Sequence, residues 1–286
     1  MLTDLFRLDG LPAQVLPSAM PSMSPGDVVA NVAFQPGNWP MQRQAIRGVK
    51  FNNVDMSNNT FQQLTFNGCH FEDCLFKTSI FREVEFHNCT FANCNFWKAK
   101  FEQCYLDPTT ISFAKRFKVE AANVGVTLYQ SLLSNYDNER QDTFFADADY
   151  RFRQWKRYQL SWDIRKQHIG PWQGRWEYFR SLAYEWTAGF GYKPVRFFMV
   201  TLCLFLAVSC LNYVLIGESV SVGGQHTTHM SFVDSIYYSF SILTVLGFSS
   251  IVPNTAFAKL LTVCEALAAI GWLGIFTSIV VKRVLR

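Results

Sequence analysis

The chain has 286 residues and a formal net charge of +4, with 17% charged and 49% hydrophobic residues. That charged fraction is low for a soluble protein, whereas a mean hydropathy of +0.05 is too polar for a chain that lies wholly in a membrane. So many apolar residues also exclude a disordered chain, and the length predicts roughly two domains. The 27 phenylalanines, the most numerous aromatic residues, indicate a repeat or membrane segments.

Residues 1–45 open without a secretory signal and are rich in proline. We therefore expect them to form a cytosolic N-terminal cap segment, with residues 30–34 and Trp39 covering one end of the domain that follows. Reduced thiols are expected in that compartment. None of the eight cysteines has the C-x2-C spacing of a zinc site, so no metal site and no cofactor are predicted.

A five-residue repeat runs from Ile46 to Leu106, where every fifth residue is large and apolar. All ten phenylalanines between these residues lie in this one register. A second series of mostly small or branched residues stands two positions before each centre, beginning at Val49. Because neither a helix nor a flat strand has a period of five, the pattern predicts a square coil with one pentapeptide on each side.

This repeat resembles the pentapeptide-repeat family, which implies a right-handed quadrilateral β-helix over residues 46–110. Residues twenty apart would then stack about 4.8 Å from coil to coil. That places Cys69 below Cys89 and Cys74 below Cys94. These cysteines are expected to be small core fillers, with a redox switch or metal binding as alternatives. Six acidic and six basic residues within 46–106 leave no acidic field, so the DNA mimicry of some family members is not expected.

Residues 111–168 have a helical pattern and predict a hairpin adaptor, with a turn at residues 135–138 and a second helix from about Gln141. The pair resembles a tetratricopeptide-like hairpin; a surface for a partner is the alternative. Residues 169–193 are predicted to form an interfacial helix, since basic residues mixed with Trp and Tyr just before an apolar run suit the lipid headgroup zone. RNA binding would need the same residue types, but the nearby apolar run favours lipid, and no nucleic-acid partner is expected.

Two apolar stretches, residues 197–216 and 257–281, are long enough to cross a membrane. Lys282 and Arg283 follow the second stretch at once, whereas no Lys or Arg lies between Ile216 and Lys259. The positive-inside rule therefore predicts two spans in the cell membrane with both termini cytoplasmic. The alternative is a buried helix pair in a soluble protein.

The segment between the spans predicts a short buried helix that begins at a capping box, Ser231 to Asp234, and is too short to cross. With the segment after it, this helix resembles the pore region of two-helix potassium channels. That resemblance covers residues 194–286. Aligned without gaps, the chain keeps eight residues of the family pattern: Ser231, Phe232, Asp234, Tyr237, Ser239, Thr244, Gly247 and Pro253.

By this resemblance the selectivity filter consists of Thr244, Val245, Leu246, Gly247, Phe248 and Ser249. In the family, four copies present backbone carbonyls that replace the water around K⁺. Val245 lacks the hydroxyl of the family's filter threonine. Ser249 stands where a second glycine adopts a conformation that costs serine strain, and Ser250 replaces an aspartate. These departures predict cation conduction without strict K⁺ selectivity.

The second span carries Glu265, an ionisable residue that is a candidate functional group in a membrane. Its alternative role is to brace the filter, together with Asp234 and Ser250. Gly271 and Gly274 stand where inner helices of the family bend, with close helix packing as the alternative. The remaining gate candidates are Phe276 and Thr277.

The sequence thus predicts a multidomain membrane protein: a β-helix, a helical adaptor, and a two-span channel domain with a re-entrant pore loop. We expect a homotetramer that passes cations, K⁺ or less selectively, and that is gated or assembled by the repeat domain. No catalytic motif is present, so no enzyme is predicted. The alternative is a membrane-anchored scaffold or sensor whose degenerate pore does not conduct.

Overall fold

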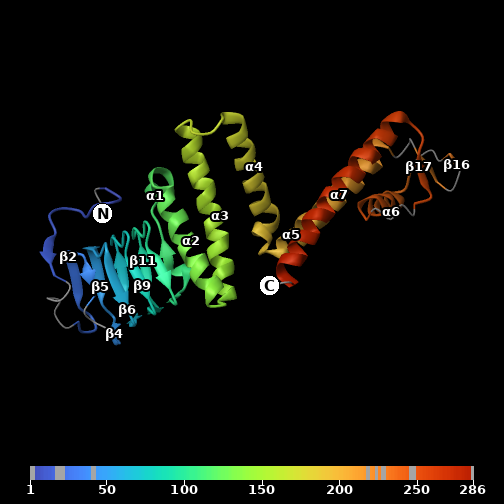
Figure 1. Cartoon of the computed structure of the whole chain (residues 1–286). Coiled ribbons are helices and arrows are strands. Elements are labelled where there is room, and N and C mark those ends of the chain that lie inside the picture. Colours follow the sequence, from blue (N-terminus) through green and yellow to red (C-terminus); the bar gives the residue numbers. More distant parts are fainter. Residues whose placement is uncertain are drawn as a thin grey trace. The chain divides into compact units, whose positions relative to one another are not determined.

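The computed structural model describes residues 4–16, 23–39, 43–216, 220–222, 225–226, 230–244 and 249–284. The chain divides into two compact units, Met1–Ser181 and Leu182–Arg286, which are described separately below. The first unit is a β-solenoid followed by helices, and the second is helical with a small sheet (Figure 1).

The solenoid is built from three parallel sheets in which strands of successive coils lie side by side (Figure 1). The first sheet, in order, has β1 (Ala13–Val15), β2 (Val28–Phe34), β5 (Lys50–Asp55), β8 (His70–Glu72), β11 (Thr90–Ala92) and β14 (Ile111–Ser112). The second has β13 (Tyr105–Leu106), β10 (Glu85–His87), β7 (Leu64–Asn67) and β4 (Gln44–Arg47). The third has β12 (Lys100–Glu102), β9 (Ile80–Arg82), β6 (Asn59–Gln62) and β3 (Gly37–Asn38).

The register of these sheets confirms the stacking predicted from the repeat. Phe71 pairs with Phe51 on one side and with Phe91 on the other, each twenty residues away. A fourth row carries only the bridges that join Asp55, Leu75 and Asn95. Each turn of the coil therefore takes twenty residues in four rows.

The core of the solenoid consists of stacked phenylalanine rings. The ring centroids of Phe51 and Phe71 are 4.8 Å apart, and those of Phe71 and Phe91 are also 4.8 Å apart, with nearly parallel planes. Rings of adjacent sides, such as Phe66 and Phe71, meet edge to face at 5.6 Å. Both geometries are favourable for aromatic pairs, so the five-residue repeat fixes the whole core.

The corners of the coil place non-glycine residues in the left-handed backbone region. Asn53, Gln63, Asp73 and Asn93 have φ between 52° and 56°, each two residues after a central phenylalanine. Asn and Asp tolerate this region better than most residues. The polar residues between the two apolar series therefore form the corners.

Both ends of the stack are covered. Trp39 is 2% exposed and lies against Phe61, with 4.9 Å between ring centroids. The segment 30–34, expected only as a cap, is instead part of β2, which pairs with β5 and continues the first sheet. At the other end Asn135 accepts a hydrogen bond from Cys104 N and donates one to Cys104 O, both 2.8 Å long. Its amide thus takes the place of a further strand.

The helices of the first unit are α1 (Lys115–Glu120), α2 (Ala122–Asn138), α3 (Asp142–Arg165) and most of α4 (Pro171–Ala188). A 3-10 turn, η2 (Pro108–Thr110), links the solenoid to them. The turn predicted at residues 135–138 is wrong, because α2 continues to Asn138. Asn135 and Tyr136 are buried against the last coil, and this packing outweighs their local preference for a turn.

The N-terminal segment runs across the fourth row of the solenoid, where regular strands are missing. Asn95 Nδ2 donates to Leu5 O at 2.6 Å, and Lys77 Nζ donates to Phe6 O at 2.8 Å. Further along, Asn53 Nδ2 donates to Asp9 O at 2.9 Å. Side chains from successive coils therefore bind the backbone of this segment.

The second unit contains two long apolar helices. It comprises η3 (Gly189–Gly191), α5 (Pro194–Leu215), β15 (Val220–Val222), β16 (Gln225–His226), α6 (Phe232–Leu243), β17 (Ile251–Pro253) and α7 (Ala256–Val284). Only 11% of each long apolar stretch, in α5 and in α7, is buried. These are therefore candidate membrane spans, and not the buried core helices of a soluble unit.

Candidate functional site

The short helix α6 begins as the sequence predicted. Ser231 is its N-cap, and the Ser231 hydroxyl accepts a hydrogen bond from Val233 N. Asp234 lies in the first turn, where a negative side chain favours the helix dipole. On the same helix Ser235 donates to the carbonyl of Ser209 in α5 at 2.6 Å. The start of α6 is thus fixed both locally and against the first span.

A polar cluster joins α5, α6 and α7. Asn212 of α5 donates from Nδ2 to Ser239 Oγ of α6 at 2.9 Å and to Glu265 Oε2 of α7 at 3.2 Å. Asn212 and Ser239 are almost completely buried. We call these three residues the polar clamp. Because water is absent from a bilayer core, such hydrogen bonds hold membrane helices in one arrangement.

Two further contacts fix α7 against its neighbours. The hydroxyls of Tyr238 in α6 and Thr262 in α7 are 2.6 Å apart. Trp272 Nε1 donates to Thr201 Oγ1 in α5 at 2.9 Å, and its ring stacks on Phe197 with a centroid distance of 5.0 Å. The helix α6 is therefore hydrogen-bonded to both long helices, and these two helices also contact each other directly.

The predicted filter follows directly from α6. Thr244 is the C-cap residue of this helix, and its hydroxyl donates to Phe240 O at 2.7 Å. Val245, Leu246, Gly247 and Phe248 lie outside the described residues. Ser249 is half-buried and donates from Oγ to Ile251 O at 3.1 Å, whereas Ser250 is exposed. The structure thus describes the residues at both ends of the predicted filter, Thr244 and Ser249.

The inner-helix candidates lie on different faces of α7, which runs unbroken through both glycines. A side chain added at Gly271 or Gly274 would meet no atom within 4 Å in the described chain. Phe276 packs on α5, with ring centroids 6.1 Å from Phe197. Thr277 is exposed on another face. The structure therefore brings together Glu265 and α6, which are joined through Asn212, but it separates Phe276 from Thr277.

The sequence reasoning missed the role of Asn212. This residue is the only Asn, Asp, Gln or Glu within the first apolar stretch, residues 197–216. A strongly polar side chain in a span usually faces other helices. That signal could have marked Asn212 as a residue that contacts another helix, but it does not identify the partner.

The cysteines of the solenoid behave as hydrogen-bonded core atoms. Cys69, Cys74, Cys89, Cys94 and Cys104 are all buried and free. Their Sγ atoms donate to the coil before, as from Cys94 to Phe71 O at 3.4 Å. Burial raises the pKa of the Cys104 thiol to about 11. Among the described residues no group of three or more His, Cys, Asp or Glu could hold a metal ion.

Comparison with known proteins gives two family matches. The family described as "Ion channel" matches residues 197–286, which include α5, α6 and α7. The family described as "SV2A/B/C luminal domain" matches residues 30–111, which are the stacked coils. No curated protein matches the chain. The chain therefore carries an ion channel domain at residues 197–286, preceded by a β-solenoid of stacked coils that is consistent with pentapeptide repeats.

Proposed function

We propose that four copies of this chain surround one pore and pass cations through the segment 244–249. The observation that carries this proposal is α6. It is a twelve-residue helix, too short to span a membrane, capped by Ser231 and held between two candidate spans. Its C-terminal end, at Thr244, leads into the segment. The negative end of a helix dipole favours cations there.

The filter in this proposal is less selective than that of a potassium channel. Val245 has no hydroxyl to contribute to the innermost ion site, and Ser249 replaces a glycine. Both changes remove ligands or backbone freedom that closely spaced carbonyl rings need. We infer that K⁺ passes together with other monovalent cations.

Glu265 supports the filter from behind in this account. The polar clamp joins it to α6, whose end positions Thr244. A change in the clamp would therefore move the first filter residue. We assign the same supporting role to Asp234, in the first turn of α6, and to Ser250, which directly follows the segment.

The gate lies further along α7, with Gly271 and Gly274 giving the helix room to bend. Thr277 is the better candidate for a pore-facing residue, because it is exposed whereas Phe276 packs on α5. The solenoid and adaptor would assemble the four copies or bias this gate.

For the topology, we propose a cell-membrane protein with two spans and both termini cytoplasmic. The helix α4 would lie in the headgroup zone, since Trp172, Trp176 and Trp186 are 83%, 65% and 67% exposed. Tryptophan favours that zone. The charge distribution of the sequence supports the same orientation.

Ion efflux from liposomes tests conduction. Purified protein in potassium-loaded vesicles should release K⁺ faster than protein-free vesicles. Gly247→Asp should abolish the difference, because it places a side chain where carbonyls must face ions. Ser249→Gly and Val245→Thr restore the family residues and should raise the ratio of K⁺ to Na⁺ flux. Leu211→Ala, at an exposed position on α5, is the control and should leave the flux unchanged.

The second candidate function is a membrane-anchored scaffold with a closed, degenerate pore. The same departures at Val245, Ser249 and Ser250 favour it. Wild-type vesicles that release K⁺ no faster than empty ones, at all voltages and membrane tensions applied, would support the scaffold and contradict conduction.

A further inference from the structure

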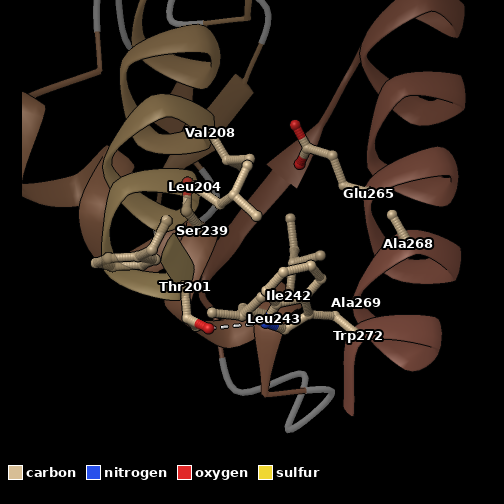
Figure 2. Close-up of a pocket in the computed structure, with 11 residues that line it drawn as sticks. Thr201, Leu204, Val208, Ser239, Ile242, Leu243, Glu265, Ala268, Ala269 and Trp272 are labelled. Carbon is tan, nitrogen blue, oxygen red and sulfur yellow. Dashed lines mark hydrogen bonds between the residues drawn. The ribbon is translucent and has the colours of Figure 1, made fainter. Parts of the chain in front are cut away.

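An open pocket lies within the channel domain, lined by residues of α5, α6 and α7 (Figure 2). Its cavity volume is about 180 Å³. Its wall is mostly apolar and includes the side chains of Leu204, Phe205, Ile242, Leu243 and Trp272. An apolar cavity of about 150 Å³ in another protein binds benzene, so this one has room for a single small ring.

Most polar atoms of the pocket are already engaged. Thr201 Oγ1 accepts from Trp272 Nε1 at 2.9 Å and donates to Phe197 O at 2.8 Å. Ser239 Oγ and Glu265 Oε2 both accept from the amide of Asn212. These contacts leave one acceptor to consider.

That acceptor is the second carboxylate oxygen of Glu265. Oε1 is buried and has no hydrogen-bond partner among the described residues. Figure 2 shows the carboxylate reaching from α7 toward the side of α5 and α6. No Lys, Arg or His is among the described residues that line the pocket. A buried acceptor without a donor is costly, so a ligand that supplies one gains affinity.

We propose that this pocket binds a small lipophilic amine, with its ammonium group on Glu265 Oε1 and its apolar body against Phe205, Ile242 and Trp272. An ammonium ion provides three donors and the opposite charge, which a neutral aromatic molecule lacks. Leu204, at the rim, is 46% exposed on a candidate span. The amine therefore enters from the membrane phase, where amphiphiles concentrate.

The proposal requires the fold of the channel domain but no ion flow, so binding is measured directly. The probes are 4-fluorobenzylamine and its neutral analogue 4-fluorotoluene. Each is titrated into the full-length protein in lipid nanodiscs and followed by fluorine NMR, with empty nanodiscs to correct for partitioning into lipid. In the wild type both should bind saturably, and the amine should bind more tightly.

Three variants separate the charge from the cavity. Glu265→Gln should weaken binding of the amine about tenfold or more, as expected for the loss of one charge-assisted hydrogen bond. The affinity for fluorotoluene should change by less than about twofold. Ala268→Leu fills the pocket and should weaken both probes. Ala266→Leu is the same substitution on the same helix outside the lining, and it should weaken neither.

Two results overturn the proposal. One is a wild-type protein that binds neither probe saturably or binds fluorotoluene as tightly as the amine. This comparison needs no variant and stands even where Glu265→Gln disturbs the fold. The other is amine binding that Glu265→Gln or Ala268→Leu leaves unchanged. Neither result depends on whether the channel conducts.

Discussion

The polar clamp gives the sharpest prediction for the channel domain. Asn212→Leu removes the side chain that joins α5 to both Ser239 and Glu265 through hydrogen bonds of 2.9 and 3.2 Å. The leucine has a similar volume but no donor. Helix α6 should therefore open more often while the chain stays folded.

The size of the effect follows from two contributions. Hydrogen bonds between membrane helices average about 0.6 kcal/mol each, so losing two costs about 1 kcal/mol. A buried carboxylate left without its donor adds roughly 1–3 kcal/mol. Asn212→Leu should thus lower the opening free energy of α6 by about 2–4 kcal/mol. Asn212→Leu with Glu265→Leu should reduce stability by only about 1 kcal/mol, because the carboxylate is removed together with its donor and only the Ser239 hydroxyl loses a partner.

Hydrogen exchange of the peptide that covers α6 measures this cost in full-length protein in nanodiscs. Its opening free energy should fall in Asn212→Leu and largely recover in the double variant. Cys210→Leu, at an exposed position on α5 two residues before Asn212, should leave the exchange of α6 unchanged. The reasoning is refuted where Asn212→Leu leaves exchange of α6 unchanged, or where the double variant is as unstable as the sum of both single variants.

Three further predictions concern the solenoid and use urea unfolding of the full chain, read from exchange of its strand peptides. Phe71→Ala should lower the free energy of unfolding by about 3–5 kcal/mol, since the Phe71 ring is stacked on both sides. Tyr105→Ala, at an exposed site, should lower it by less than about 1 kcal/mol. Equal losses in the two variants would contradict the stacked core. Asn135→Ala should cost about 1–3 kcal/mol because it leaves the last coil unpaired, and an unchanged midpoint would show that α2 does not cap the stack. Burial raises the pKa of Cys104 from 9.0 to about 11, so its folded thiol keeps a proton that the unfolded one releases. Stability should therefore fall between pH 9 and 11, by up to about 1.4 kcal/mol per pH unit, and Cys104→Ala should reduce that fall.

The solenoid could be predicted well from sequence because its period is local. One phenylalanine every five residues determines the register, the ring columns and the positions of the cysteines. The N-terminal segment was harder, since Leu5 and Phe6 are held by Asn95 and Lys77 through contacts some seventy to ninety residues apart in the chain. No repeat in the sequence announces such contacts.

The helical parts show where local preference fails. Residues 135–138 are rich in turn formers, but Asn135 is used as a buried cap and keeps the helix going. In the channel domain the pattern around Ser231 and Thr244 predicted the ends of α6, because capping depends on neighbouring residues. The partnership of Asn212 with Glu265 depends on helix packing across 53 residues, which the pattern of one chain does not contain.

The central claim is that residues 244–249 form a cation path, and unitary currents test it most directly. Wild-type protein in a planar bilayer with KCl at different concentrations on the two sides should give discrete current steps. Their reversal potential should lie close to the equilibrium potential of K⁺ and far from that of chloride. Gly247→Asp should remove the steps. Steps that persist in Gly247→Asp, or a reversal potential set by chloride, would contradict this account.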